Sequence, residues 1–220
     1  MKIYYWSPFL SKIATISSVI KSIEAIKSYS NKNADISIID SIGEWEQIPE
    51  KTKDIKIIKL YKKSIINKLP KGGFLRSRFT QLFIFFFSFF KLLNLLKKDQ
   101  PDYLIAHLIV SLPLILITFM QSKTKLVIRI SGLPRLNIFR KLYWRFFGKK
   151  VYKVTCPSIA TLEKLKLLDI FDKAKLYLLH DPVISSKEIV FKKNEPIEPK
   201  YNNKKIIVSI GRLTKQKNFS

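Results

Sequence analysis

Short apolar runs rich in isoleucine alternate along this chain with longer segments of helical periodicity, and this alternation constrains the fold more than any other feature. The short runs predict strands at residues 2–6, 34–40, 55–60, 102–107, 125–130, 151–155 and 175–180. The segments between them predict helices at residues 12–29, 74–98, 108–121, 138–148 and 158–168. Strands that alternate with helices form mostly parallel sheets covered on both faces. We therefore predict an α/β fold, a doubly wound Rossmann-like sheet, over residues 1–181.

Individual residues refine this prediction. Lysine alternates with apolar residues in 55–60, which is typical of a strand near the edge of a sheet. The long helix is expected to end before Pro101, because the residue before a proline avoids the helical region. Pro113 falls in the first turn of its predicted helix, where a proline is tolerated.

Two apolar stretches are candidates for membrane spans, residues 79–96 and 103–120. In the first, the unbroken apolar core is short compared with the roughly 20 residues that a span requires, and basic residues flank it. We interpret it as a helix with a wide apolar face, which could lie on an anionic membrane. The second is interpreted as a buried strand that leads into a buried helix. If either stretch spans, the protein is an integral membrane protein.

The chain is strongly basic, with 41 lysine and arginine residues against 16 acidic ones and a formal charge of +25. Such a charge attracts phosphate-bearing partners: an anionic membrane, nucleotide-linked substrates or nucleic acid. Nucleic-acid binding stays an alternative, although no helix-turn-helix, zinc finger or aromatic RNA-binding strand is visible. One cysteine and two histidines exclude a disulfide scaffold and argue against structural zinc. No cofactor-binding or metal-binding motif is present, so we predict neither a cofactor nor a metal site.

The composition of the chain changes after residue 181. Residues 182–203 are polar, contain three prolines and lack periodicity, as expected of a linker. Residues 204–220 begin as a new buried strand and continue into a Gly-Arg loop. Since a lone strand cannot fold by itself, we expect this segment to be the truncated start of a second α/β domain.

The sequence GRLTKQKN at 211–218 is the strongest motif. Gly211 permits a sharp turn under a ligand, Arg212 can make a two-pronged contact with phosphate, and Lys217 adds a charge to the same group. A solvated basic turn is the alternative. Gly72-Gly73 has the composition of a phosphate loop, but no strand directly precedes it, so we predict a turn there.

The run IIVSIGRLTKQKNFS resembles the opening of the donor-binding domain of family 4 glycosyltransferases, which have the two-domain GT-B fold. Four more stretches resemble that family's amino-terminal domain in order and pattern: PDYLIAHL, KLVIRISGLPRL, VYKVTCPSIATLEKL and LLHDPVI. The resemblance implies that Gly211, Arg212 and Lys217 hold the diphosphate of a nucleotide-sugar. It also implies that His107 faces the cleft near the transferred sugar, where it bonds a sugar hydroxyl or stabilises developing charge; a general base is the weaker alternative, since a retaining enzyme need not have one. A core histidine is the alternative interpretation.

The sequence departs from the family pattern at two places. The Gly-Gly loop often found after the first strand is replaced by SPFLSKIAT, so Ser11, Lys12 and Thr15 are only positional candidates for acceptor or donor contact. The His-Gly site is Ser131-Gly132, with Arg129 just before it, which makes Arg129 and Ser131 further contact candidates.

We therefore expect a fragment of a hexosyltransferase-type enzyme that is inactive by itself. Its partners would be a nucleotide-sugar donor, a lipid-linked or lipopolysaccharide-type glycan acceptor and an anionic membrane. Its opening residues lack the apolar run of a secretory signal, and we place it at the cytoplasmic face of the cell membrane. Basic and aromatic residues between 135 and 150 fit a membrane interface, a polyanionic acceptor or an ordinary amphipathic helix: Arg135, Arg140, Lys141, Tyr143, Trp144, Arg145, Phe146, Phe147, Lys149 and Lys150.

Overall fold

The structure, a computed structural model, describes residues 1–10, 14–30, 34–69, 74–120, 122–134, 136–182, 186–196 and 205. The chain divides into two compact units, Met1–Val183 and Ile184–Ser220. The first unit contains the sheet and the candidate site.

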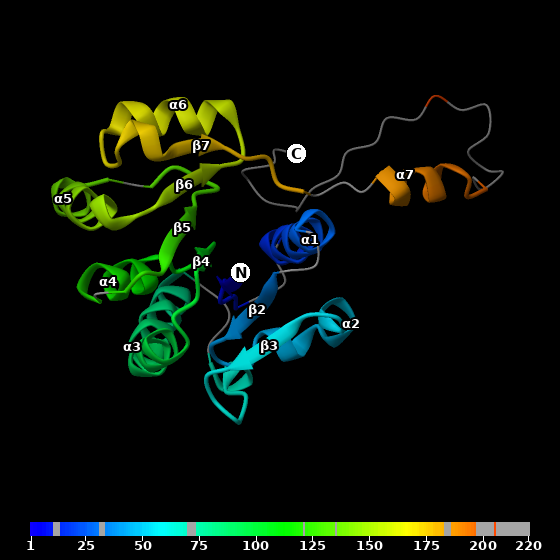
Figure 1. Ribbon diagram of the computed structural model, residues 1–220, viewed down its shortest axis with the longest axis horizontal. Coiled ribbons are helices and arrows are strands. Elements are labelled where there is room, and N and C mark those ends of the chain that lie inside the picture. The colour runs from blue at the N-terminus through cyan, green and yellow to red at the C-terminus, as the bar shows by residue number, and fades with distance from the viewer. Residues whose placement is uncertain are drawn as a thin grey trace. The chain divides into compact units, whose positions relative to one another are not determined.

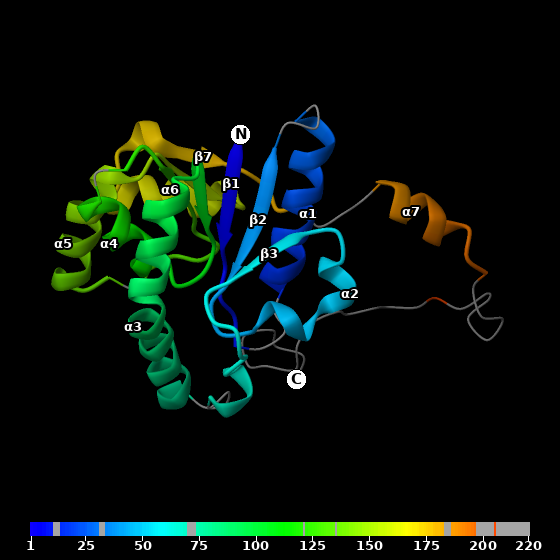
Figure 2. The ribbon, with the colours of Figure 1, turned by 60° about the horizontal axis from the view of Figure 1, so that its bottom comes forward.

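Among the described residues, seven parallel strands form one sheet at the centre of the first unit (Figures 1 and 2). The strands are β1 (Lys2–Trp6), β2 (Asp35–Asp40), β3 (Lys56–Lys59), β4 (Tyr103–Ala106), β5 (Lys125–Arg129), β6 (Lys153–Cys156) and β7 (Leu176–Leu178). Their order across the sheet is β3-β2-β1-β4-β5-β6-β7. The predicted doubly wound sheet is confirmed, and the lysine-bearing strand β3 lies at an edge as expected.

Helices cover the two faces of the sheet unequally (Figure 1). The helices are α1 (Ala14–Tyr29), α2 (Pro49–Thr52), α3 (Phe74–Asp99), α4 (Ser111–Phe119), α5 (Ile138–Phe147) and α6 (Ile159–Leu168). The chain builds β1, β2 and β3 in one direction, returns through α3 to β4 and continues the other way. Because such crossovers are right-handed, this reversal places α1 and α2 on one face and the later helices on the other.

Side chains of β1 alternate between the two cores. Ile3 and Tyr5 pack with the buried residues of α1, whereas Tyr4 and Trp6 pack with buried residues of α3 and α4. Each of these four side chains is at most 3% exposed. The helix predicted at 12–29 is confirmed as α1, which buries Ile16, Val19, Ile20 and Ile23 along one side. A strand covered on both faces is apolar at successive positions, which is why these runs could be recognised in the sequence.

Helix α3 is much longer than the strands that it crosses. Its 26 residues span about 39 Å at 1.5 Å per residue, whereas the six residues of β2 span about 20 Å. The Tyr4 hydroxyl donates to the Asp99 carboxylate, which fastens the carboxyl end of α3 beside the start of β1. The excess length of α3 therefore extends past the opposite, carboxyl edge of the sheet (Figure 2).

The two apolar stretches have different structures. Residues 103–120 divide into strand β4 and helix α4, as predicted, and Pro113 occupies the third position of α4. Residues 79–96 lie within α3, which ends at Asp99, just before Gln100 and Pro101. Within the described part of the chain, Phe79–Asp99 is the one helix long and apolar enough to cross a bilayer, and 28% of its most apolar window is buried in the protein.

The second unit begins inside the segment predicted to be a linker. Its described residues include α7 (Ser186–Lys193), a helix that the sequence analysis did not predict. Eight residues are too few to display a clear helical period, which explains the omission. The predicted strand and Gly-Arg loop at 206–220, and the Gly72-Gly73 turn, lie outside the described residues.

A buried pair of carboxyl groups shapes the turn after β2. The backbone N–H groups of Ser41 and Ile42 donate to the Glu44 carboxylate over 3.1 and 2.7 Å, and the N–H of Gly43 donates to Asp40 over 2.8 Å. Gly43 has φ +93°, and a Cβ added there would lie 2.1 Å from the Ser64 hydroxyl oxygen. Burial, and next the neighbouring Asp40 carboxyl, raise the pKa of Glu44 well above its ordinary value.

We predict that Glu44→Gln flattens the dependence of stability on pH. A carboxyl group whose pKa is raised by folding stabilises the protein below its ordinary pKa, and this stability is lost as the pH rises through the raised pKa. The wild-type chain should therefore lose stability from this group, by at most about 1.4 kcal/mol per pH unit, and the variant should not. Urea unfolding of both proteins from pH 4.5 upward measures the difference, and parallel curves would contradict it.

Candidate functional site

A pocket of about 270 Å³ lies on the α1 face of the sheet. One flank of α1 forms its first wall, with Ser18, Ser22 and Ile26. Residues of β1, β4, β5 and β6 and the segment after β7 form the rest: Tyr5, Ile105, His107, Val127, Arg129, Thr155 and Leu179–Pro182. The charged and ring-nitrogen groups of this pocket follow or end their strands, so they gather at the carboxyl edge, where parallel sheets bind ligands.

His107 follows β4 directly and is the predicted catalytic residue. Its backbone N–H donates to the carbonyl of Trp6 over 3.0 Å, and its ring centroid lies 5.9 Å from that of Tyr5. The Nδ1 atom is buried, and among the described residues it has no hydrogen-bonding partner. Burial, and next the charge of Arg129, lower the pKa of His107 to about 3. The ring is therefore neutral at physiological pH and available to a ligand.

A neutral ring of this kind suits one chemical role better than another. It can donate or accept one hydrogen bond, for example with a hydroxyl group. It is a poor general base near pH 7, because an efficient base has a pKa close to the working pH. Of the roles expected for His107, the lowered pKa and the buried Nδ1 favour the hydrogen bond.

Arg129 ends β5 and is 5% exposed. Its Nη2 atom lies 2.6 Å from Asp181 Oδ1, and its Nη1 donates to the carbonyl of Leu179 over 2.8 Å. Since β6 separates β5 from β7, the arginine reaches across one strand to hold the segment after β7. The guanidinium charge of Arg129 is thus largely balanced by Asp181. Its clearest effects are to hold the segment after β7 in place and to help keep the His107 ring neutral.

The other predicted site residues either lie outside the pocket or fall outside the described residues. Thr15 lies half-buried in the first turn of α1 and Ser131 is exposed after β5, and neither lines the pocket. The remaining candidates lie outside the described residues: Ser11, Lys12, Gly211, Arg212 and Lys217. Of the predicted residues that are described, the structure brings His107 and Arg129 together.

Asp181 and His180 also line the pocket, and neither was predicted from the sequence. His180 is exposed and its Nδ1 lies 2.8 Å from the carbonyl oxygen of Pro157, which links the segments after β6 and β7. The available signals were a His-Asp pair at the end of the predicted strand 175–180 and the stretch LLHDPVI, which contains that pair. Among the described residues, no group of three or more metal-ligating side chains is placed to hold a metal ion.

Comparisons with known proteins support the fold but assign no family. No family model matches the chain, and no curated protein matches it by sequence. Among solved structures, UDP-GlcNAc 2-epimerase from Neisseria meningitidis bound to UDP-GlcNAc is 14% identical with a TM-score of 0.59, covering 88% of this chain and 50% of that one. The apo lipopolysaccharide outer core galactosyltransferase WaaB is 12% identical with a TM-score of 0.55, covering 82% and 45%.

A third structure, Anabaena Alr3699/HepE in complex with UDP, is 11% identical with a TM-score of 0.50, covering 82% of this chain and 44% of that one. The fold is GT-B-like. This chain spans about half the length of the solved structures that it matches. At identities of 11–14% these likenesses show the fold alone, and membership of family 4 stays a prediction.

We predict that the His107 ring stays neutral down to about pH 5, well below the ordinary histidine pKa of about 6.5. Because the unfolded chain binds a proton that the folded chain does not, this residue lowers stability as the pH falls below 6.5. Proton NMR of the ring signals measures it directly, and His107→Asn assigns them, since the chain has two histidines. Titration of the His107 signal near pH 6.5 would contradict the enclosed, uncharged site.

Proposed function

We propose that this chain is part of a nucleotide-sugar-dependent glycosyltransferase of the hexosyltransferase type. The acceptor would be a lipid-linked or lipopolysaccharide-type glycan at the cytoplasmic face of the cell membrane. One observation carries the proposal: the buried, neutral ring of His107, whose Nδ1 has no hydrogen-bonding partner among the described residues, lines a pocket with Arg129 at the carboxyl edge of a GT-B-like sheet. The solved structures of similar fold include proteins bound to UDP-GlcNAc and UDP, which supports a nucleotide-sugar as the donor.

In the proposed reaction, the bond between the anomeric carbon of the sugar and the diphosphate oxygen breaks. The electron pair leaves with the nucleoside diphosphate. A hydroxyl oxygen of the acceptor forms the new bond to the anomeric carbon, and its proton passes to the departing diphosphate. His107 would hold a sugar hydroxyl and so fix the orientation of the ring, a contribution of geometry rather than of proton transfer.

The charge on the departing diphosphate requires cations. Arg212 and Lys217 are proposed to supply them, because an arginine fork and a lysine five residues later can contact one diphosphate group. Gly211 would let the backbone approach the phosphates. Groups that stabilise charge as it develops make large contributions to rate, so these positions are expected to matter for transfer as well as for binding.

The function is tested by incubating the full-length protein with radiolabelled nucleotide-sugars and a bacterial lipid extract. We expect label to move from one donor into the lipid-linked or polysaccharide fraction, and His107→Ala to slow the transfer with a small effect on donor binding. Conversion of UDP-GlcNAc to its 2-epimer without an acceptor would instead indicate an epimerase, the reaction named for one structure of similar fold.

We predict that Arg212→Ala and Lys217→Ala each weaken nucleotide-sugar binding by about 1.5–3 kcal/mol, the value of a hydrogen bond to a charged group. Isothermal titration calorimetry of the full-length protein measures the change. Lys215→Ala, at a neighbouring lysine of the same basic run, is the matched control and should bind the donor as the wild type does. Unchanged affinity in both test variants would reject the diphosphate assignment.

A further inference from the structure

Two helices on the face opposite α1 carry rows of exposed apolar side chains. They are Phe79, Leu82, Phe86 and Phe90 of α3 and Ile138, Phe139, Leu142 and Phe146 of α5, which together are called the apolar helix face. Each of these side chains is between 58% and 82% exposed. Positions 82, 86 and 90, like positions 138, 142 and 146, are four residues apart and so follow one side of their helix. Rows of this kind mark interaction sites more often than scattered single residues do.

The inner side of α3 is already used by the core. Ile84, Leu92 and Leu96 are fully buried against the sheet and its loops, and the carboxyl end of the helix is fastened through Asp99 to Tyr4. For α3 to cross a bilayer, these side chains would have to leave their core. The helix therefore presents its outer side to a partner while its inner side stays packed.

The apolar helix face reaches the same edge of the sheet as the candidate site. Tyr61, just after β3, donates to the carbonyl of Phe87 and stacks on its ring with centroids 4.0 Å apart. The part of α3 that precedes Phe87 thus extends beyond the carboxyl edge (Figure 2). Helix α5 also starts at this edge, because it follows the end of β5. A surface that covers these helix ends lies close to where the sheet gathers His107 and Arg129.

The segment that carries these helices is strongly basic, although one of its basic residues, Arg129, lies in the pocket on the other face. Residues 74–150, which contain α3, α4 and α5, include 14 basic residues and two acidic ones, Asp99 and Asp102. Exposed Lys91, Lys97 and Lys98 belong to α3, and exposed Lys149 and Lys150 follow α5. An apolar face bordered by lysines complements the interface of an anionic bilayer, where rings reach headgroup depth and ammonium groups meet phosphates.

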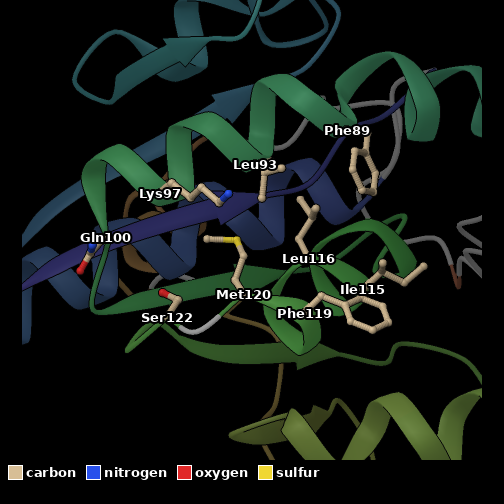
Figure 3. Close-up of a pocket in the computed structure, with 9 residues that line it drawn as sticks. All are labelled: Phe89, Leu93, Lys97, Gln100, Ile115, Leu116, Phe119, Met120 and Ser122. Atoms are coloured by element: carbon tan, nitrogen blue, oxygen red, sulfur yellow. The ribbon is translucent and has the colours of Figure 1, made fainter.

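A groove of about 450 Å³ opens between α3 and α4 (Figure 3). Apolar side chains form most of its walls, among them Phe89, Leu93, Leu116 and Phe119. Lys97, Gln100 and Ser122 lie together at one end (Figure 3). A mostly apolar groove with polar groups at one end matches a single acyl chain with an anionic headgroup.

We propose that the apolar helix face docks on an anionic phospholipid bilayer and that the groove between α3 and α4 takes one acyl chain. The docking proposal rests on the proposed function in one respect. If the acceptor is lipid-linked, docking on the membrane brings the acceptor to the carboxyl edge of the sheet. The lipid contact itself depends only on α3, α4 and α5.

The docking is tested by flotation of the purified protein with vesicles, without any sugar donor. We expect binding to vesicles that contain phosphatidylglycerol, weak binding to phosphatidylcholine alone, and loss of binding at high salt. Phe86→Glu should lower vesicle affinity about tenfold or more, because it removes one buried aromatic side chain from the interface. Tyr29→Glu, the same type of change at an 87% exposed residue of α1, is the control and should bind as the wild type does.

Three results would overturn the docking: equal vesicle affinity of Phe86→Glu and Tyr29→Glu, self-association that Phe86→Glu abolishes without any vesicle binding, or release from cell membranes only by detergent and not by alkaline carbonate.

The groove is tested with Leu93→Trp, which fills it from α3 and should weaken binding of lysophosphatidylglycerol monomers. Circular dichroism checks the folding of each variant. Unchanged lysophospholipid binding would overturn the acyl-chain site. Donor binding measured by calorimetry without vesicles tests the proposed function separately.

Discussion

Every connection between consecutive strands of this sheet passes through a crossover, so all seven strands end at one edge. This constraint brings together residues that are far apart in the sequence. His107, Arg129 and Asp181 follow or end three different strands, yet they line one pocket. The chain reversal between β1 and β4 adds a second condition, because it leaves β4 to β7 without a described helix on the α1 face. The pocket exists where α1 stops covering the sheet.

The length of α3 links this edge to a surface on the other face. A helix that only needed to connect β3 with β4 could be about half as long. The additional turns carry Phe79, Leu82 and Phe86 past the strand ends, where they are exposed. One helix thus supplies core residues along its inner side and an exposed apolar row along its outer side. Its apolar composition, which makes it resemble a membrane span, follows from these two requirements together.

The sequence predicted the order of strands and helices because strands covered on both faces are apolar throughout and helices show their period. It also predicted the edge position of β3, and His107 at the end of β4. It could not predict that Arg129 pairs with Asp181, because this contact depends on the lateral distance across β6. The Asp40–Glu44 turn was also not predicted, because no sequence pattern indicates that two carboxyl groups are buried beside each other. The roles of Gly211, Arg212 and Lys217 stay predictions.

The proposed function requires sugar transfer to take place in the pocket at the carboxyl edge of the sheet. A crystal structure of the full-length protein with an intact nucleotide-sugar tests this most directly. The sugar ring is expected to lie within hydrogen-bonding distance of the His107 ring, with Arg129 still paired to Asp181. A donor bound with its sugar away from this edge, and an empty pocket beside His107, would contradict it.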